Sequence, residues 1–308
     1  MKLVFMGTPQ AAVPTLERLI ADGHDVVAVY TQPDRPAGRG NKITFGPVKQ
    51  FAVDHGTEIL QPTKIKTPEA LEVFKSHDAD VAVVVAYGRI LPEAFLTAFP
   101  QGAINVHFSL LPRYRGAAPV NWAIARGETF TGVTTMQMDA GLDTGDILLQ
   151  RAVDIGESET APELMTRLSL MGADLLSETL RRLDEIIPQS QNEGEASYAP
   201  ILKREDGLIE WDRSAKEITD RIRGFQPFPS SFTFRNGKKI TVWRAIAGGT
   251  IRGEPGTVAS IDSDTFEVAC GDGSVLSVME IQPEGKRRVS AADYVNGVRL
   301  KVGDKFGS

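Results

Sequence analysis

Two polar residues at the end of an apolar run are the strongest candidates for chemistry in this sequence. Asn105 and His107 stand two positions apart in the run INVHFSLLP, where a buried strand would normally carry Val or Ile. Residues i and i+2 of a strand point to the same face of the sheet. Burying an amide and an imidazole costs free energy unless both find partners, so the pair is predicted to face a ligand where its strand ends.

A carboxylate elsewhere in the chain completes this group. Asp143 lies among glycines in the run MDAGLDTGDIL. An amide and a protonated imidazole can hold the oxyanion that forms during acyl transfer to an amine, and a carboxylate would orient the ring and favour its protonated form. No G-x-S-x-G run offers a covalent nucleophile. The residues alone leave another interpretation open, in which His107 is a capped strand-end residue and Asp143 a turn residue.

The segments that must position these residues alternate between strands and helices up to about residue 150. Apolar strands separated by helices predict a Rossmann-like, mostly parallel sheet with helices on both faces, and ligands bind such sheets beyond the carboxyl ends of the strands. The predicted strands are Leu3–Met6, Val26–Tyr30, Val81–Val85, Ile104–His107 and Val133–Met138. The predicted helices are Ala12–Ala21, Pro47–His55, Pro68–Ser76 and a long one from Thr160, with a capping box to Glu163, to about Ile187.

The C-terminal part of the sequence has a different pattern. A polar stretch bounded by prolines, Pro188–Pro200, indicates a linker. Beyond it, short alternating runs with Asn-Gly and Asp-Gly turn signals predict a small antiparallel, OB-like β-barrel. We therefore expect a catalytic domain over residues 1–187, a linker over 188–203 and a barrel over 204–308.

Composition excludes several classes of protein. Hydrophobic residues make up 42% and charged residues 24%, which is typical of a globular protein. No apolar run reaches the ~18 residues that span a membrane, and the N-terminus lacks the pattern of a signal peptide. A single cysteine, Cys270, excludes a disulfide framework and a cysteine-based zinc site. We expect a cytoplasmic monomer with no metal and no membrane partner. The net charge of −6 argues against a nucleic-acid partner, but the C-terminal third is close to neutral and carries basic clusters.

Four segments together resemble the formyltransferases that use 10-formyltetrahydrofolate: NVHFSLLPRYRGAAPVNWAI, MQMDAGLDTGDIL, FMGTP and VVAYGRILP. The resemblance implies that the catalytic asparagine, histidine and aspartate of the family fall on Asn105, His107 and Asp143. It also implies folate contacts from the SLLP segment and from the loop that follows the third predicted strand, namely Ser109, Leu110, Leu111, Pro112, Tyr87 and Gly88. One departure is Phe108, where Gly or Ala is expected; because it alternates away from His107, it should change packing and leave the chemistry alone.

Three further segments, TQPDRPAGRGNK, RGAAPVNWA and GFQPFPSSF, resemble the branch of this family that formylates methionyl initiator tRNA. The resemblance implies that the basic loop Gln32–Pro47, which its prolines and glycines should leave without regular structure, inserts at the acceptor end of the tRNA. The implied tRNA contacts are Arg39 above all, with Arg35, Lys42, Lys203 and Arg204. Basic clusters of the predicted barrel are further candidates for phosphate contacts: Arg235, Lys238, Lys239, Arg244, Lys286, Arg287 and Arg288. Without the resemblance, the loop and the clusters would be ordinary solvated surface, and Trp211 and Trp243 are expected in the core.

Other functions remain open. Formyl transfer to a small amine, such as glycinamide ribonucleotide or an amino sugar, and hydrolysis of the formyl donor would use the same Asn–His–Asp set. The basic loop and the C-terminal domain favour tRNA over a small amine. A non-catalytic RNA-binding protein would have no use for the Asn–His–Asp set. A nicotinamide dehydrogenase would need G-x-G-x-x-G after the first strand, and MGTPQAAV lacks it.

Overall fold

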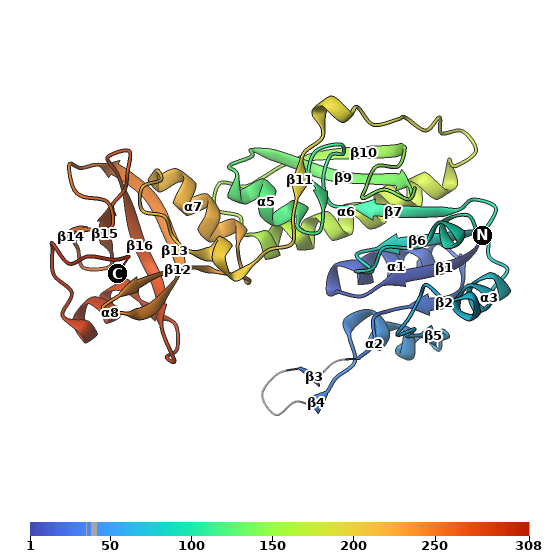
Figure 1. The fold of residues 1–308 in the computed structure, drawn as a ribbon, viewed down its shortest axis with the longest axis horizontal. Helices are drawn as coiled ribbons and strands as arrows, with labels where there is room; N and C mark the ends of the chain where they lie inside the picture. Colours follow the sequence, from blue (N-terminus) through green and yellow to red (C-terminus); the bar gives the residue numbers. More distant parts are fainter. Residues whose placement is uncertain (35, 38–41, 308) are drawn as a thin grey trace. The chain divides into compact units, whose positions relative to one another are not determined.

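The computed structural model describes residues 1–34, 36–37 and 42–307. The described chain forms two compact units, whose elements are labelled in Figure 1. Unit 1 consists of Met1–Pro119, Thr131–Val153 and Met165–Ala199, and unit 2 consists of Val120–Phe130, Asp154–Leu164 and the rest from Pro200. Two short segments from the middle of the sequence therefore pack within the unit that contains the C-terminal strands.

Unit 1 is built on a sheet that, over the described residues, has seven strands in the order β10-β9-β7-β6-β1-β2-β5. The five strands from β7 to β5 run parallel, and β9 runs antiparallel to β7. This confirms the predicted mostly parallel sheet. Its strands are β1 (Lys2–Gly7), β2 (Asp25–Tyr30), β5 (Ile59–Leu60), β6 (Val81–Val85), β7 (Ala103–His107), β9 (Phe130–Gln137) and β10 (Ile147–Asp154).

Helices cover this sheet, which explains why its central strands are apolar throughout. All five residues of β6, with the sequence VAVVV, are buried, as a strand with both faces covered requires. The helices are α1 (Val13–Ala21), α2 (Pro47–Asp54), α3 (Pro68–Ser76), α4 (Glu93–Leu96) and α6 (Ala161–Arg181), with short 3-10 turns η1 (Gln10–Ala12) and η2 (Glu193–Glu195).

Two sequence predictions for this part of the chain need correction. Helix α6 begins as expected, with Glu163 accepting hydrogen bonds from the backbone and hydroxyl of Thr160, but it ends at Arg181 and not near Ile187. Acidic residues after Arg182 oppose the negative end of the helix dipole, which disfavours extension. The basic loop also contains regular structure, because β3 (Pro36–Ala37) pairs antiparallel with β4 (Lys42–Ile43).

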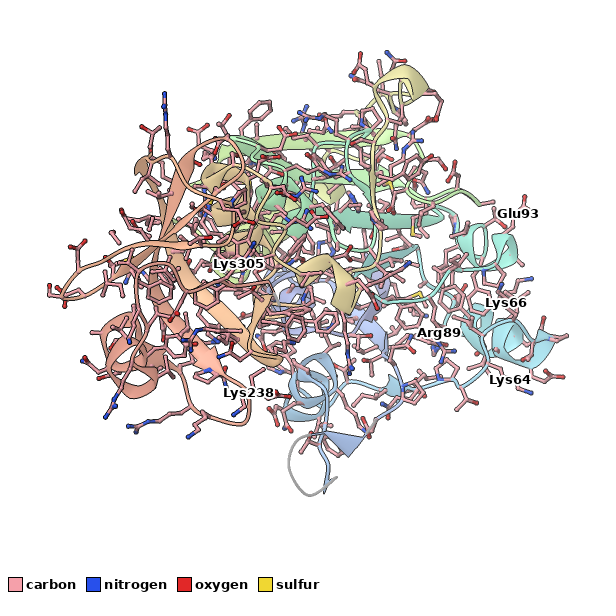
Figure 2. All side chains as sticks on the ribbon, turned by 60° about the vertical axis from the view of Figure 1, so that its left-hand side comes forward. Lys64, Lys66, Arg89, Glu93, Lys238 and Lys305 are labelled. Carbon is pink, nitrogen blue, oxygen red and sulfur yellow. The ribbon has the colours of Figure 1, made fainter. Side chains whose placement is uncertain are left out.

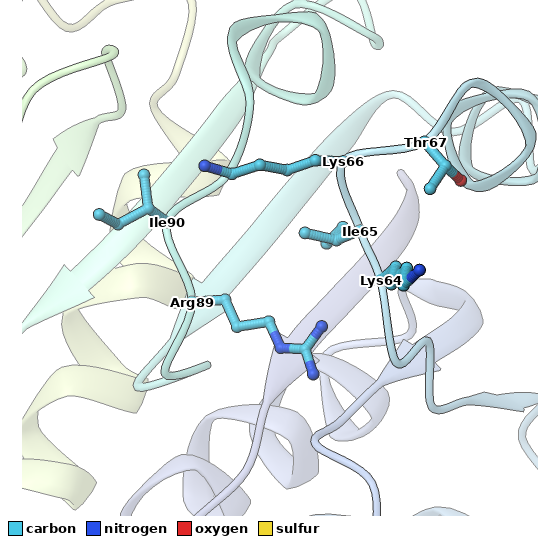
Figure 3. Close-up of a pocket in the computed structure, with 6 residues that line it drawn as sticks. All are labelled: Lys64, Ile65, Lys66, Thr67, Arg89 and Ile90. Carbon is cyan, nitrogen blue, oxygen red and sulfur yellow. The ribbon is translucent and has the colours of Figure 1, made fainter.

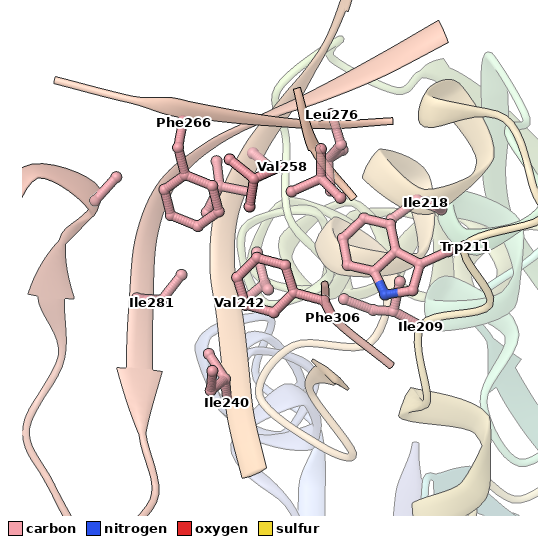
Figure 4. Packing of buried hydrophobic residues seen from close by; sticks show 14 of the residues in the cluster. Ile209, Trp211, Ile218, Ile240, Val242, Val258, Phe266, Leu276, Ile281 and Phe306 are labelled. Atoms are coloured by element: carbon pink, nitrogen blue, oxygen red, sulfur yellow. The ribbon is translucent and has the colours of Figure 1, made fainter. Parts of the chain in front are cut away.

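Unit 2 contains an antiparallel sheet with the order β12-β13-β16-β15-β14, and β17 pairs with β16. Its apolar core, seen in Figure 4, includes Trp211, Phe266 and Phe306. Helix α5 (Pro119–Ala125) belongs to unit 2 except for its first residue. The other elements of unit 2 are η3 (Arg204–Gly207), α7 (Ala215–Gly224), β12 (Ser231–Arg235), β13 (Lys238–Thr250), β14 (Val258–Ile261), β15 (Phe266–Ala269), β16 (Ser274–Pro283), β17 (Val289–Ser290) and α8 (Ala291–Val298).

The segment after α8 connects the two edge strands of this sheet. At β14, the Val258 amide donates to the Asp304 carbonyl over 2.8 Å, and the Gly303 amide donates to the Val258 carbonyl over 2.9 Å. At β12, the Gly307 amide donates to the Phe234 carbonyl over 2.8 Å. Residues 303–307 therefore occupy backbone groups on both edges, which closes the sheet on itself as the predicted barrel requires.

Two sequence segments noted above, RGAAPVNWA and GFQPFPSSF, pack against each other in unit 2. The side-chain amide of Asn121 donates to the Gly224 carbonyl over 2.7 Å. The rings of Trp122 and Phe225 meet edge to face, with centroids 5.3 Å apart. Asn121, Trp122, Gly224 and Phe225 therefore join α5 to α7, and this packing explains the presence of the two segments without a contact to a ligand.

In the part of the chain that the structure describes, no helix combines the length and the apolar character needed to cross a membrane.

The close approach of α5 and α7 depends on the absence of a side chain at Gly224. A Cβ there would lie 2.7 Å from the backbone nitrogen of Ala125 and 2.7 Å from the carbonyl oxygen of Asn121. We expect Gly224→Ala to lower the free energy of unfolding by about 1–3 kcal/mol through overpacking, measured by urea denaturation. Gly249→Ala is the matched control, because a Cβ at Gly249 has no neighbour within 4 Å. Equal midpoints for both variants would contradict this account of the contact.

Candidate active site

Asn105 and His107 lie on β7, where the parallel part of the sheet ends. Both side chains are buried, with residue exposures of 8% and 6%. The Nε2 of His107 lies 2.9 Å from the carbonyl oxygen of Tyr114, to which it donates. The Asn105 side-chain amide makes no hydrogen bond with any part of the chain that the structure describes. Asn105 therefore offers an uncommitted N–H donor in a largely dry position, which is what an oxyanion needs.

Asp143 approaches the same histidine from a distant loop. Its Oδ2 lies 3.7 Å from His107 Nδ1 and accepts a hydrogen bond of 2.7 Å from the Gly116 amide. Asp143 adopts the left-handed conformation, with φ of 55°, which is uncommon for residues other than glycine. The structure thus brings Asn105, His107 and Asp143 together, and it places a carboxylate where it stabilises a positive charge on the ring.

The SLLP segment is held in place by polar residues of the neighbouring strands. The Thr134 hydroxyl donates to the Ser109 carbonyl over 2.6 Å and accepts from the Leu111 amide over 3.1 Å. The side chain of Gln150 donates to Thr134 Oγ1 and to the Leu111 carbonyl. Ser109 is fully buried, and its own hydroxyl donates to the Arg113 carbonyl over 2.6 Å. The Ser109 hydroxyl therefore shapes the turn from within, while Leu110 and Pro112 are partly exposed.

Tyr87 lies in the loop after β6, two residues beyond the end of the strand, and its ring is directed into the apolar core. Tyr87 is 2% exposed, and burial raises the pKa of its hydroxyl. Its carbonyl oxygen accepts hydrogen bonds from Thr8 Oγ1 over 3.2 Å and from Gln32 Nε2 over 3.1 Å. Gly88, which follows, is exposed and has a φ of 81°. Tyr87 anchors the loop, and the backbone from Gly88 onward is the part that is free to meet a ligand.

A cationic cavity of about 490 Å³ lies where this loop faces the segment before α3. Figure 3 shows Lys66 and Ile65 on one side and Arg89 and Ile90 on the other. In Figure 2, Lys64, Lys66 and Arg89 are labelled close to one another, and they come from two separate segments of the chain. Arg89 is oriented by hydrogen bonds to the Gln32 side chain and to the Thr63 carbonyl. Three positive side chains around one cavity favour a ligand with carboxylate or phosphate groups.

The predicted tRNA contacts are less defined. Arg35 and Arg39 lie outside the described residues, and Lys42 is placed only as part of strand β4. Lys203 and Arg204 are both exposed. The remaining basic candidates are exposed, except for Arg235, which pairs with Asp304 over 2.7 Å, and the half-buried Lys239, which lies over the Phe232 ring.

The two tryptophans of the C-terminal unit have different environments. Trp211 lies in the core, as expected, and donates from Nε1 to Thr233 Oγ1 over 3.1 Å. Trp243 is half-buried, contrary to the expectation of a core position, and the guanidinium of Arg288 stacks on its ring at 3.4 Å from the centroid. The register of β13 explains this, because Trp243 follows the buried residue Val242 at a point where the pairing of β13 with β16 shifts.

Sequence reasoning missed the residues that support the site from behind. Thr134 and Gln150 are single polar residues on strands, and no spacing rule marks them. The segment predicted to be a linker also belongs to this support, since β11 (Tyr198–Ala199) pairs with β8 (Arg115–Gly116) beside the Asp143 contact. The composition of the segment gave no signal of this, because Gln191 and Glu193 are ordinary residues of a polar linker, although they bind a buried arginine.

Comparison with known proteins places the chain in a family. Residues 1–180 match the family described as formyl transferase, and residues 201–299 match the formyl transferase C-terminal domain. The chain is 47% identical over 310 residues to a methionyl-tRNA formyltransferase of Geobacter sulfurreducens, covering 100% of this chain and 97% of that protein.

Solved structures show that the fold is shared as well. One match is a methionyl-tRNA formyltransferase from Clostridium thermocellum, with 19% identity and a TM-score of 0.58. The match covers 92% of this chain and 98% of that one. Another match is an N-formyltransferase from Helicobacter canadensis, solved with folinic acid and dTDP-3-aminofucose, with 20% identity and a TM-score of 0.67. This match covers 92% of this chain and 99% of that one. With these matches along both parts of the sequence, the chain belongs to the formyl transferase family, and within it to the methionyl-tRNA formyltransferases.

Proposed function

We propose that this protein transfers the formyl group of 10-formyltetrahydrofolate to the α-amino group of methionyl initiator tRNA. The observation that carries the proposal is the convergence of Asn105, His107 and Asp143 at the end of β7. Family membership and near-complete alignment with methionyl-tRNA formyltransferases support the choice of formyl donor and acceptor. The monomeric state and the cytoplasmic location expected from the sequence stay predictions.

The proposed chemistry is direct attack by the amine. Its nitrogen forms a bond to the formyl carbon, the bond from that carbon to N10 of the folate breaks, and the proton lost by the amine is taken up at N10. Asn105 donates its free amide N–H to the oxyanion that forms in between. His107 already donates from Nε2 to Tyr114, so it contributes the positive charge of its protonated ring, which Asp143 stabilises from the Nδ1 side.

The cationic cavity gives the folate a second point of attachment. Gly88 to Ile90 follow β6, the parallel neighbour of β7, so the cavity and the Asn–His pair lie at the carboxyl ends of adjacent strands. The folate glutamate tail carries carboxylates, which Lys64, Lys66 and Arg89 suit in charge. We assign the pterin end to the backbone after Tyr87 and to Leu110, Leu111 and Pro112.

The acceptor tRNA requires basic surface beyond this site. We assign this role to the loop that carries Arg35, Arg39 and Lys42, and to the exposed pair Lys203 and Arg204. Arg39 is the residue we expect to matter most, because a guanidinium can bind phosphate or stack on an unpaired base. Mass spectrometry of the aminoacyl end, after incubation with the formyl donor and charged initiator tRNA, tests the whole proposal. An unmodified methionyl end would exclude it and leave a small amine or a non-catalytic role.

Asn105→Ala should lower kcat by about 10²–10³-fold, because it removes the donor that is aimed at the oxyanion. Since the asparagine makes no hydrogen bond within the described chain, the substitution should not unfold the protein. Formyl-folate binding, measured by calorimetry, should change little. A variant with normal thermal stability and near-normal kcat would remove Asn105 from the mechanism.

Asp143→Asn keeps an oxygen that accepts from the Gly116 amide but removes the negative charge beside His107. We expect kcat to fall about 10²-fold or more. Asp146→Asn is the matched control, since Asp146 lies in the same loop and its carboxylate accepts from Ser190 Oγ, away from His107. The measurement is kcat for both variants, with thermal midpoints compared to that of wild type. An unchanged kcat for Asp143→Asn would reduce Asp143 to a turn residue.

Lys66→Ala should raise KM for the formyl donor and leave kcat nearly unchanged, because the cavity binds the substrate away from the reacting atoms. The increase in KM should be larger for a donor with several glutamates than for one that lacks the glutamate. Lys75→Ala, on the exposed end of α3, is the control. Equal KM values for the two donors in wild type would show that the cavity does not bind the tail.

A further inference from the structure

Gln191, in the segment expected to be a linker, contacts the loop that carries Asp143. Its side-chain Nε2 donates to the Asp143 carbonyl over 2.9 Å and to the Gly145 carbonyl over 2.7 Å. Both N–H groups of the amide are therefore used on this one loop. Gly145 cannot carry a side chain, because a Cβ would lie 1.8 Å from the Gln137 carbonyl oxygen. The loop is thus packed against the sheet on one side and held by Gln191 on the other.

The orientation of the Gln191 amide is fixed by its other contact. Its Oε1 accepts from Arg115 Nε over 3.0 Å and from Nη2 over 2.9 Å. Arg115 is fully buried, and its guanidinium also forms two hydrogen bonds with Glu193, of 2.9 and 2.7 Å. The hydrogen bonds with Glu193 raise the pKa of Arg115 and lower that of Glu193. Because guanidinium groups only donate, the amide oxygen must face Arg115 and the NH2 must face the loop.

The hydrogen bonds of Gln191 stabilise the backbone conformation of Asp143. With a φ of 55°, Asp143 has a left-handed backbone conformation that is uncommon for residues other than glycine. Gln191 binds the carbonyl of that same residue, and the Asp143 carboxylate is then directed at the Gly116 amide and His107. Arg115, which orients Gln191, and Gly116, whose amide donates to Asp143, are consecutive residues of one strand, β8.

We propose that Gln191 is a positioning residue for formyl transfer, which holds the Asp143 loop so that the carboxylate faces His107. This inference rests on the proposed function, since it presumes that Asp143 acts through its charge on the histidine. Gln191 touches neither substrate nor the reacting atoms in this scheme. Its effect passes entirely through Asp143.

The variant that tests the inference is Gln191→Glu, which has the same shape. A carboxylate retains the contact with Arg115 but presents oxygen, and not N–H, to the carbonyls of Asp143 and Gly145. We expect kcat to fall about 10-fold to 100-fold, as small displacements of catalytic groups do, with KM for both substrates nearly unchanged. Gln191→Met, which keeps the bulk without polar atoms, should give a loss in the same direction. Ser190→Ala is the matched control, because its hydroxyl binds Asp146 in the same loop and should be dispensable.

A double-mutant cycle separates positioning from a general effect on structure. In the Asp143→Asn background, Gln191→Glu should cost less than 3-fold, because no charge remains to be positioned. The loss in Gln191→Glu should appear in kcat and not in KM, as in Asp143→Asn, with thermal midpoints close to that of wild type. An equal fold-loss in both backgrounds, or normal kcat in both Gln191 variants, would overturn the inference. If Asp143→Asn itself leaves kcat unchanged, the proposed role of Asp143 fails, which is a different result from failure at Gln191 alone.

Discussion

The Asp143 carboxylate holds together parts of the chain that lie far apart in sequence. It accepts a hydrogen bond from Gly116, lies beside His107, and belongs to a loop whose carbonyls are bound by Gln191. A partly buried carboxylate loses part of its hydration, and such donors and positive charge compensate for that loss. The geometry of the end of β7, of β8 and of the segment before β11 is therefore coupled at this point.

This dependence changes the role of the polar segment before residue 200. Its composition suits a flexible connection, yet Gln191 and Glu193 satisfy the guanidinium of Arg115, which is fully buried. A buried arginine left without these partners would destabilise unit 1 strongly, because a lone charge in the interior loses its hydration. The end of unit 1 is thus tied to the same strand that receives Asp143, and its residues cannot be exchanged freely for other polar ones.

Periodicity was enough to predict the main elements. Strand β6 and helix α3 have the predicted bounds, the bounds of β1, β2, β7, α1 and α2 and the start of α6 lie within one residue of those predicted, and β9 begins three residues earlier than expected. Continuous apolar runs and capping residues are local signals, so sequence alone exposes them. The Asn–His pair was visible because polar residues at buried strand positions are anomalous. Thr134, Gln150 and Gln191 could not be found in this way, since their importance comes from contacts between segments that are distant in sequence. The domain boundaries given from the sequence stay a prediction.

The segment that closes the sheet of unit 2 has a consequence for how this unit forms during synthesis. Residues 303–307 supply hydrogen bonds to both β12 and β14, and a ribosome makes them after every strand of that sheet. Until residues 303–307 are made, β14 keeps open backbone groups at Val258 and β12 keeps an open carbonyl at Phe234, although the Ile209 amide already occupies the Phe232 carbonyl of β12. Open groups of this kind can pair with another nascent chain. Pairing of the outer strands is therefore completed only by residues 303–307, and translation that stops shortly before them would release a chain more prone to aggregation.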